Sequence, residues 1–461
     1  MGVFKKTALS VKTEKTKTCY TAFALNGDKK GVLRADESMN CDIRDGVLRG
    51  GLGGTEMYTD DGKYKVKSSG LPIATHFFLL PGLDGLDNPT EQLGALGDNN
   101  GVFYTYDKYT TTWVLMQTFS SRMKGLYIVD VNGVKSSVII GATGLYLFTF
   151  GKAMKSTSWK NLGAKAHLAC FQQGRLFFIQ EPHTLRYSAP YDAANLEQSI
   201  KEGGGIQLPS HCGEIVDLAA FDGKVYIFYQ EGIACVEPAG AACDFKVKEL
   251  PYRHGLIFSG SVGECGKKLF FLNENGVFCI ENDEVKEVCK NLSLFPLRGD
   301  QVCNHGSFSG QYAVTYEDIS GVDKCVVVDA ETEDGYFSFV PSRLSDYKGG
   351  AVACCDGYLW HLFRGGKMPS VGKRAFVVND LKFGGGGART LERLELIGAG
   401  SVKVTVKSGS KSKTFTMAMT GGRAEKDISL HGKTFSLRLE LQDNAYLSGL
   451  NILSSQFVKK S

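Results

Sequence analysis

The feature that most limits the fold of this chain is a glycine-led segment that recurs through its middle. In Phe221–Val236 two apolar runs flank Gln230-Glu231-Gly232. Val, Ile, Tyr and Phe favour half-buried strands and Glu-Gly is turn chemistry, so the segment predicts a tight hairpin. Similar segments follow Gly174, Gly223, Gly266, Gly310 and Gly357, which are about 49, 43, 44 and 47 residues apart. This spacing lies in the range of a four-stranded propeller blade.

A single small sheet is only marginally stable in water, whereas blades stacked in a ring cover one another's faces. The sequence therefore predicts an all-β fold with a β-propeller. Apolar segments between residues 75 and 148 predict roughly two earlier blades with longer insertions. Together with the five glycine-marked units they predict six or seven blades.

At 461 residues the chain is too long for one ordinary core, which favours two or three bodies. The 56 glycines and the scarcity of proline suit many short strands, and no long stretch has a helical period. After a four-glycine hinge at 384–387 the apolar alternation becomes strict, as in Leu391–Ile397 and Val402–Val406. Period 2 with glycine turns predicts a small antiparallel β-sandwich. The expected domains are a basic N-terminal arm (1–20), a propeller (21–370) and a C-terminal sandwich (388–461).

The 13 cysteines are scattered and include no Cys-x-x-Cys pair, which indicates buried free thiols made in a reducing cytoplasm. The start of the chain lacks the apolar segment of a signal peptide. The longest apolar run, residues 138–150, is too short and too rich in glycine to cross a bilayer. We expect no membrane insertion.

The net charge of +4 is unevenly distributed. Residues 370–461 hold 15 Lys and Arg against 7 Asp and Glu, and residues 1–17 hold 5 against 1, so residues 18–369 are acidic. Such asymmetry is usually a solvated surface, but it also suits assembly with acidic neighbours. The residues predicted to dock partners lie at the two basic ends: Phe4, Lys5, Lys6, Lys12, Lys459 and Lys460.

The sequence predicts no active site, cofactor or metal. The eight histidines are dispersed and none has a zinc-binding spacing. His211-Cys212 suggests a thiol–imidazole pair, but neighbours on an extended strand point to opposite faces. The glycine cluster at 50–54 has neither the spacing nor the strand-to-helix context of a phosphate loop. The residues that open the repeated strands are Gly, Leu, Val and Phe, which leaves the ring centre without the charged cluster of a propeller enzyme.

Two segments resemble a known family. The first segment begins with Arg186-Tyr187-Ser188, continues after a short spacer with Asp192 and ends with Leu208-Pro209. The second segment is the predicted hairpin Ser38–Leu48. Both are similar to propeller proteins of short-tailed bacteriophages, in which the propeller forms the tail nozzle or the hub that stabilises packaged DNA below the portal.

The resemblance implies a structural protein of the virion tail, assembled in the cytoplasm of a bacterial host. It further implies a homo-hexameric ring that contacts the portal or adaptor and other tail proteins while double-stranded DNA passes through. A C-terminal module such as the predicted sandwich is common in that family. The alternative is a tail protein that binds a receptor or a glycan on the host surface.

Overall fold

The computed structural model describes residues 11–25, 30–58, 62–69, 71, 74–83, 89–97, 102–107, 111–118, 123–141, 144–149, 159–180, 182–199, 203–238, 244–299, 301–347, 350–370, 372–381, 383 and 387–459. These residues form forty strands and no α-helix. The chain divides into two compact units. The larger holds Thr55–Gly335 and Val340–Phe363, and the smaller holds Met1–Gly54, Tyr336–Phe339 and Arg364–Ser461.

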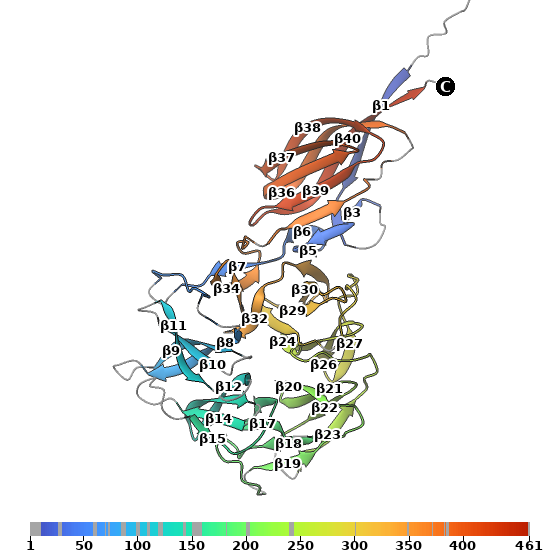
Figure 1. Ribbon diagram of the computed structural model, residues 1–461. Coiled ribbons are helices and arrows are strands. Elements are labelled where there is room, and N and C mark those ends of the chain that lie inside the picture. Colours follow the sequence, from blue (N-terminus) through green and yellow to red (C-terminus); the bar gives the residue numbers. More distant parts are fainter. Residues whose placement is uncertain are drawn as a thin grey trace, which may run out of the picture. The chain divides into compact units, whose positions relative to one another are not determined.

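Seven four-stranded sheets follow one another along the chain (Figure 1), and their residues belong to the larger unit except for Leu52–Gly54, Tyr336–Ser338 and Arg364. In the first six sheets the four strands are consecutive in the chain, and neighbouring strands pair antiparallel wherever their register is described. The first four sheets comprise β8 (Ala74–Leu83), β9 (Pro89–Gly97), β10 (Val102–Asp107) and β11 (Thr112–Thr118); β12 (Met123–Val131), β13 (Val134–Gly141), β14 (Gly144–Thr149) and β15 (Trp159–Asn161); β16 (Ala169–Gln172), β17 (Arg175–Gln180), β18 (Thr184–Tyr187) and β19 (Gly204–Gln207); and β20 (Ile215–Phe221), β21 (Lys224–Tyr229), β22 (Ile233–Val236) and β23 (Val247–Leu250).

The last sheet of the series takes its fourth strand from much earlier in the chain. Its third strand, β34 (Tyr358–Arg364), pairs with β7 (Leu52–Glu56). The first strand of this sheet, β32, also contacts the first strand of the first sheet, where the Phe77 amide donates to Ser345 Oγ at 3.1 Å. The series thus returns to its start. The last three sheets are β24 (Gly263–Cys265), β25 (Lys268–Asn273), β26 (Gly276–Glu281) and β27 (Glu284–Glu287); β28 (Asn304–Phe308), β29 (Gln311–Glu317), β30 (Asp323–Asp329) and β31 (Gly335–Ser338); and β32 (Ser342–Tyr347), β33 (Gly350–Cys355) and β34 (Tyr358–Arg364) with β7.

The repeated glycines mark hairpin turns within the sheets: Gly174, Gly223, Gly266 and Gly310 lie between the first and second strands, and Gly357 lies between the second and third. At Asp222-Gly223 both turn residues have positive φ, 45° and 76°, which is the conformation of a type I′ hairpin. Glycine reaches this region without steric cost, and Asp and Asn tolerate it. Asn132-Gly133, at 51° and 82°, makes the same turn between β12 and β13 and belongs to the series that the sequence analysis missed. The predicted hairpin within Phe221–Val236 is confirmed as β21 and β22.

The second strands are continuous apolar runs because they are buried on both faces. On β21, Val225 and Ile227 pack in one core with the sheet before, whereas Tyr226 and Phe228 pack in another with the sheet after. Strands covered on both faces lack the alternation of a half-exposed sheet. The aromatic residues predicted to be core are fully buried: Phe177, Tyr226, Phe270 and Trp360.

The smaller unit contains one ten-stranded sheet organised by a single long strand, β36 (Arg389–Ser408). Its first half pairs with β38 and β40, and its second half with β37 and β39. Between the halves Gly398 and Gly400 have φ of 154° and 81°, and a Cβ on Gly398 would lie 2.0 Å from the Tyr446 carbonyl oxygen. The predicted strands Leu391–Ile397 and Val402–Val406 are therefore one strand. The other strands are β1 (Val11–Tyr20), β4 (Glu37–Met39), β5 (Cys41–Arg44), β6 (Val47–Gly50), β35 (Ala375–Val378), β37 (Lys411–Met419), β38 (Arg423–Gly432), β39 (Ser436–Leu441) and β40 (Tyr446–Lys459), with β2 (Ala22–Ala24) and β3 (Val32–Arg34) as a parallel pair apart.

Residues near the start of the chain complete the smaller unit, which differs from the predicted domain boundaries. Residues 11–20 of the predicted arm form β1, which pairs antiparallel with β40 along its full length. The predicted propeller begins at residue 21, whereas residues up to Gly54 group with the C-terminal residues. The reason is that β1 is a largely exposed Lys- and Thr-rich strand, so it lacks the apolar alternation that marks a half-buried one. The predicted hinge at 384–387 lies outside the described residues except for Gly387.

The glycine cluster at 50–54 is packed too tightly for side chains. A Cβ on Gly50 would lie 2.6 Å from Arg374 Nε, one on Gly51 2.4 Å from the Tyr336 ring, and one on Gly53 2.4 Å from the Gly366 carbonyl oxygen. The guanidinium of Arg374 is fully buried and pairs with Asp443 at 3.1 Å. Close approach of the backbone to this arginine explains the glycines without a phosphate.

We expect Gly53→Ala to lower the free energy of unfolding by about 1–3 kcal/mol, because a backbone carbonyl cannot move aside as a flexible side chain can. Chemical denaturation measures the change. Gly299→Ala is the matched control, because a Cβ there meets no atom within 4 Å. Equal stability of the two variants would contradict this packing.

Candidate functional site

The predicted docking residues are only partly described by the structure. Lys12 lies on β1 and Lys459 on β40, and the two strands pair so that Val11 faces Lys459 and Lys12 faces Val458. The two lysines therefore lie close together at one end of this pair of strands. Phe4, Lys5, Lys6 and Lys460 lie outside the described residues.

The motif Arg186-Tyr187-Ser188 with Asp192 joins strands and turns rather than forming a reactive site. Arg186 donates to the Gly204 and Leu196 carbonyls and to Gln180, each at 3.1 Å. Ser188 Oγ accepts from the Leu176 amide at 3.0 Å. Asp192 accepts from Asn132 at 3.2 Å, which ties this loop to the turn of the preceding sheet. The motif is therefore a structural signature.

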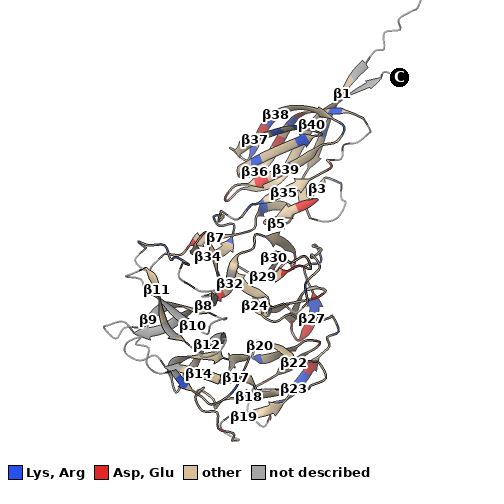
Figure 2. Ribbon diagram, viewed as in Figure 1, with Lys and Arg blue, Asp and Glu red and all other residues tan. Residues whose placement is uncertain are grey.

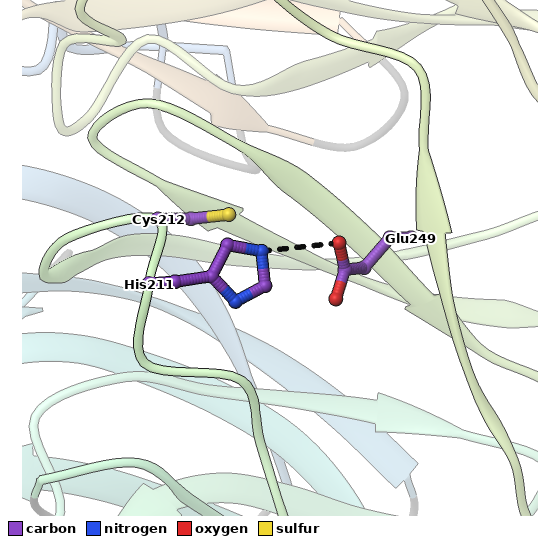
Figure 3. Close-up of side chains that lie close together, drawn as sticks. All are labelled: His211, Cys212 and Glu249. Atoms are coloured by element: carbon purple, nitrogen blue, oxygen red, sulfur yellow. Dashed lines mark ion pairs between the residues drawn. The ribbon is translucent and has the colours of Figure 1, made fainter.

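A second group of side chains is brought together by a turn. His211 and Cys212 lie in a turn before β20, and Glu249 lies on β23, the fourth strand of the same sheet. Nε2 of His211 lies 3.2 Å from Oε2 of Glu249. The ligand atoms of all three residues lie within 4.8 Å of one another. Figure 3 shows the three side chains converging on one space. The expectation that His211 and Cys212 point apart is wrong, because it assumed an extended strand.

The three residues do not form an activated nucleophile. A catalytic cysteine needs a low thiol pKa and an imidazole nitrogen directed at its sulfur. Burial and the nearby charges of Glu249 and Glu231 instead raise the pKa of Cys212. The imidazole uses Nε2 for Glu249, and its other nitrogen points away from the sulfur (Figure 3). The geometry suits a shared ligand better than a proton relay.

Another group of charged side chains, Asp217, His305 and Asp346, lies on the first strands of three sheets, β20, β28 and β32, whereas the sequence predicts no charged cluster at the ring centre. His305 Nδ1 is 2.9 Å from the Gly260 carbonyl, and its Nε2 is 3.3 Å from Asp346 Oδ2. Asp217 accepts the Gly260 amide at 3.2 Å. The expectation is wrong because the repeated glycines precede later strands of each sheet, whereas these charged residues lie on the first strands.

These contacts shift the proton affinities of the group. Burial opposes protonation of His305, but the hydrogen bond to Asp346 and its negative charge outweigh this effect and raise the pKa of His305 to about 9. Burial raises the pKa of Asp217 to about 6, even though backbone amides and His305 favour its charged form. At neutral pH His305 is therefore a cation that contacts the Asp346 carboxylate on one side and the Gly260 carbonyl on the other.

A pocket of about 360 Å³ lies beside this group and is lined by Glu264, Ser307, Asp346 and Gly350 among others. Desolvation and the charge of Asp346 raise the pKa of Glu264. Asp346 is engaged on both oxygens, because its Oδ1 accepts the Ser307 amide at 2.6 Å while Oδ2 faces His305. The pocket is acidic and large enough for a small polar ligand.

The remaining predictions on reactive groups concern cysteines and membrane spans. Twelve cysteines lie among the described residues and all are free; ten are buried, Cys212 is half-buried and Cys19 is exposed. This confirms the predicted buried thiols for the described part of the chain. Among the same residues there is no helix of the length and apolarity needed to cross a bilayer.

Comparison with known proteins yields only distant likenesses. No family model matches the chain, and no curated protein matches it. Among solved structures, an exo-β-1,3-galactanase from Phanerochaete chrysosporium is 11% identical with a TM-score of 0.30, over 84% of this chain and 98% of that one. BBS1N in complex with ARL6DN, soaked with mercury, is 14% identical with a TM-score of 0.36, over 53% of this chain and 76% of that one. Scores this low carry no functional conclusion.

Proposed function

We propose that this chain is a structural protein of a short-tailed bacteriophage tail, a nozzle or hub subunit that lines the DNA conduit and helps to retain or deliver packaged DNA. In this proposal the larger unit is a seven-bladed β-propeller, closed where β7 completes the last sheet. The smaller unit is the β-sandwich module that such proteins often carry. The phage-like motif around Arg186 and Ser188 supports the assignment, because its contacts are of the structural kind.

The observation that carries the proposal is the division of charge between the units. The smaller unit holds 27 Lys and Arg against 13 Asp and Glu, a net +14, and the larger holds 26 against 36, a net −10. Figure 2 colours the described Lys and Arg blue and the described Asp and Glu red. A conduit for DNA must bind the DNA only weakly, because every phosphate contact adds salt-dependent affinity and would slow its passage. The acidic body suits a wall along which DNA slides, and the basic unit suits docking to acidic tail proteins.

A structural role also fits the cluster on the first strands. A general acid or base needs a proton or lone pair directed at a substrate. Both ring nitrogens of His305 and both carboxylate oxygens of Asp346 are instead engaged within the protein. These bonds join neighbouring sheets, so we propose that the group holds the ring together and that the protein is not an enzyme.

Two measurements test this function. Electron microscopy of purified virions should show the chain as a ring in the tail, and native mass spectrometry of the isolated ring should give six copies. Virions that lack the chain, or an isolated ring with a different copy number, would overturn the proposal.

The second candidate is a receptor- or glycan-binding tail protein, and the acidic pocket beside Glu264 favours it. A glycan array with the full chain discriminates between the two. A conduit subunit should bind no glycan, whereas a receptor-binding protein should bind one in a manner that Glu264→Gln abolishes.

A further inference from the structure

We propose that His211, Cys212 and Glu249 form a zinc site, with Zn²⁺ held by His211 Nε2, Cys212 Sγ and a carboxylate oxygen of Glu249, and with a water in the fourth position. This site is independent of the proposed tail function. The three ligand atoms already point into one space, and all lie within 4.8 Å of one another (Figure 3).

The ligand types select the metal. Thiolate and imidazole favour zinc over magnesium or calcium, which take oxygen ligands. Cys, His and Glu are all zinc ligands, and three protein ligands with a water in the fourth position is an arrangement that zinc adopts. Metal–ligand bonds of about 2.0–2.3 Å place tetrahedral ligand atoms roughly 3.3–3.8 Å apart. The side chains of His211 and Glu249 are 66% and 49% exposed, so they are free to make the small inward movement required.

The backbone that carries the ligands is held in place before any metal binds. The Glu231 amide donates to the Cys212 carbonyl at 3.1 Å, and the Gln230 amide donates to the Glu214 carbonyl at 2.8 Å. The turn is therefore fixed to the β21–β22 hairpin. Glu249 is fixed by the pairing of β23 with β22, where it faces Ala234. A preorganised site loses less entropy on binding.

A second, independent observation points to a ligand at this place. Tyr229 is 1% exposed, and its hydroxyl has no hydrogen-bond partner among the described residues. The ring atom Cδ2 of Tyr229 and Cys212 Sγ lie 3.9 and 2.6 Å from the position that a Cβ on Gly232 would take, so the ring lies near the cysteine. Buried hydroxyls are nearly always hydrogen-bonded. A metal-bound water would supply the missing partner.

The test uses the full chain, kept reduced with a non-chelating phosphine and stripped of metal. Titration with Co²⁺ should produce one thiolate-to-cobalt charge-transfer band at one equivalent, and Zn²⁺ should displace it. Cys212→Ser should abolish the band. His211→Ala and Glu249→Gln should each weaken Zn²⁺ binding by at least about tenfold.

Two other cysteines serve as controls. Cys19→Ser changes the exposed thiol on β1, and Cys243→Ser changes the cysteine that lies outside the described residues; both should retain the band and the stoichiometry. A thiol must lose its proton to bind a metal, so calorimetry in buffers of different ionisation enthalpy should also show about one proton released per Zn²⁺ at pH 7. Absence of one-to-one binding, or a band that survives Cys212→Ser, would overturn the site.

Discussion

Tyr226→Ala is expected to lower the free energy of unfolding by about 3–5 kcal/mol, as measured by chemical denaturation. Tyr226 is 1% exposed in the core between the fourth and fifth sheets. Its hydroxyl donates to Asp283 Oδ1 at 2.7 Å, and Asp283 also accepts from Lys224 and Lys248 at 2.7 and 3.0 Å. The substitution therefore leaves a large cavity and removes one of the bonds that join neighbouring sheets.

Tyr226→Phe separates the two effects, because it keeps the ring and removes only the hydroxyl. This variant should lose about 1.5–3 kcal/mol, the usual contribution of one hydrogen bond to a charged partner. If Tyr226→Ala is no less stable than Tyr226→Phe, the packing of these sheets is not as described.

The stability of the larger unit should fall as the pH rises from about 6.5 to about 9. His305 has a pKa of about 9 in the folded chain against an ordinary value of 6.5, so its contribution is complete below pH 6.5 and is lost as the pH passes 9. The difference corresponds to about 3 kcal/mol. Asp217 has a pKa raised to about 6, so it also makes stability fall with rising pH, but at lower pH than His305. Its contribution to stability is present below pH 3.8 and is lost as the pH passes 6.

His305→Asn should flatten the profile of melting temperature against pH between 6.5 and 9. Asp346→Asn is the matched variant, because it leaves the histidine in place and removes the partner that raises its pKa. A slope that persists unchanged in both variants would show that other groups cause the pH dependence.

Local chemistry made much of the fold predictable. A hairpin with two residues of positive φ needs Asp-Gly or a similar pair, so Gly223 and Gly357 reveal one sheet each from the sequence alone. The buried second strands, such as Lys224–Tyr229, are equally easy to predict, because coverage of both faces makes them continuous apolar runs. By contrast β7 reads Leu-Gly-Gly-Thr-Glu, and nothing local indicates that it pairs with a strand some 300 residues later.

The candidate sites were harder to predict, because they depend on contacts between distant residues. Glu249 follows Cys212 by 37 residues, and only the sheet that contains β20 and β23 brings them together. The direction of the His211 side chain depends on whether the local backbone turns, which the pair His-Cys does not specify. His305 and Asp346 belong to first strands of different sheets and meet only through the packing of those sheets.

The pairing of β1 with β40 has a consequence for synthesis on the ribosome. Residues 11–20 cannot form this pair until residues 450–459 have been synthesised. At a translation rate of 5–20 residues per second the delay is roughly 20–90 s. During that time a nascent strand with no partner is a template for pairing with other chains, and lysine is the residue that discourages such pairing. The three lysines in VKTEKTKTCY thus protect the unfinished chain as well as forming the ion pairs of Lys15 and Lys17 in the finished one.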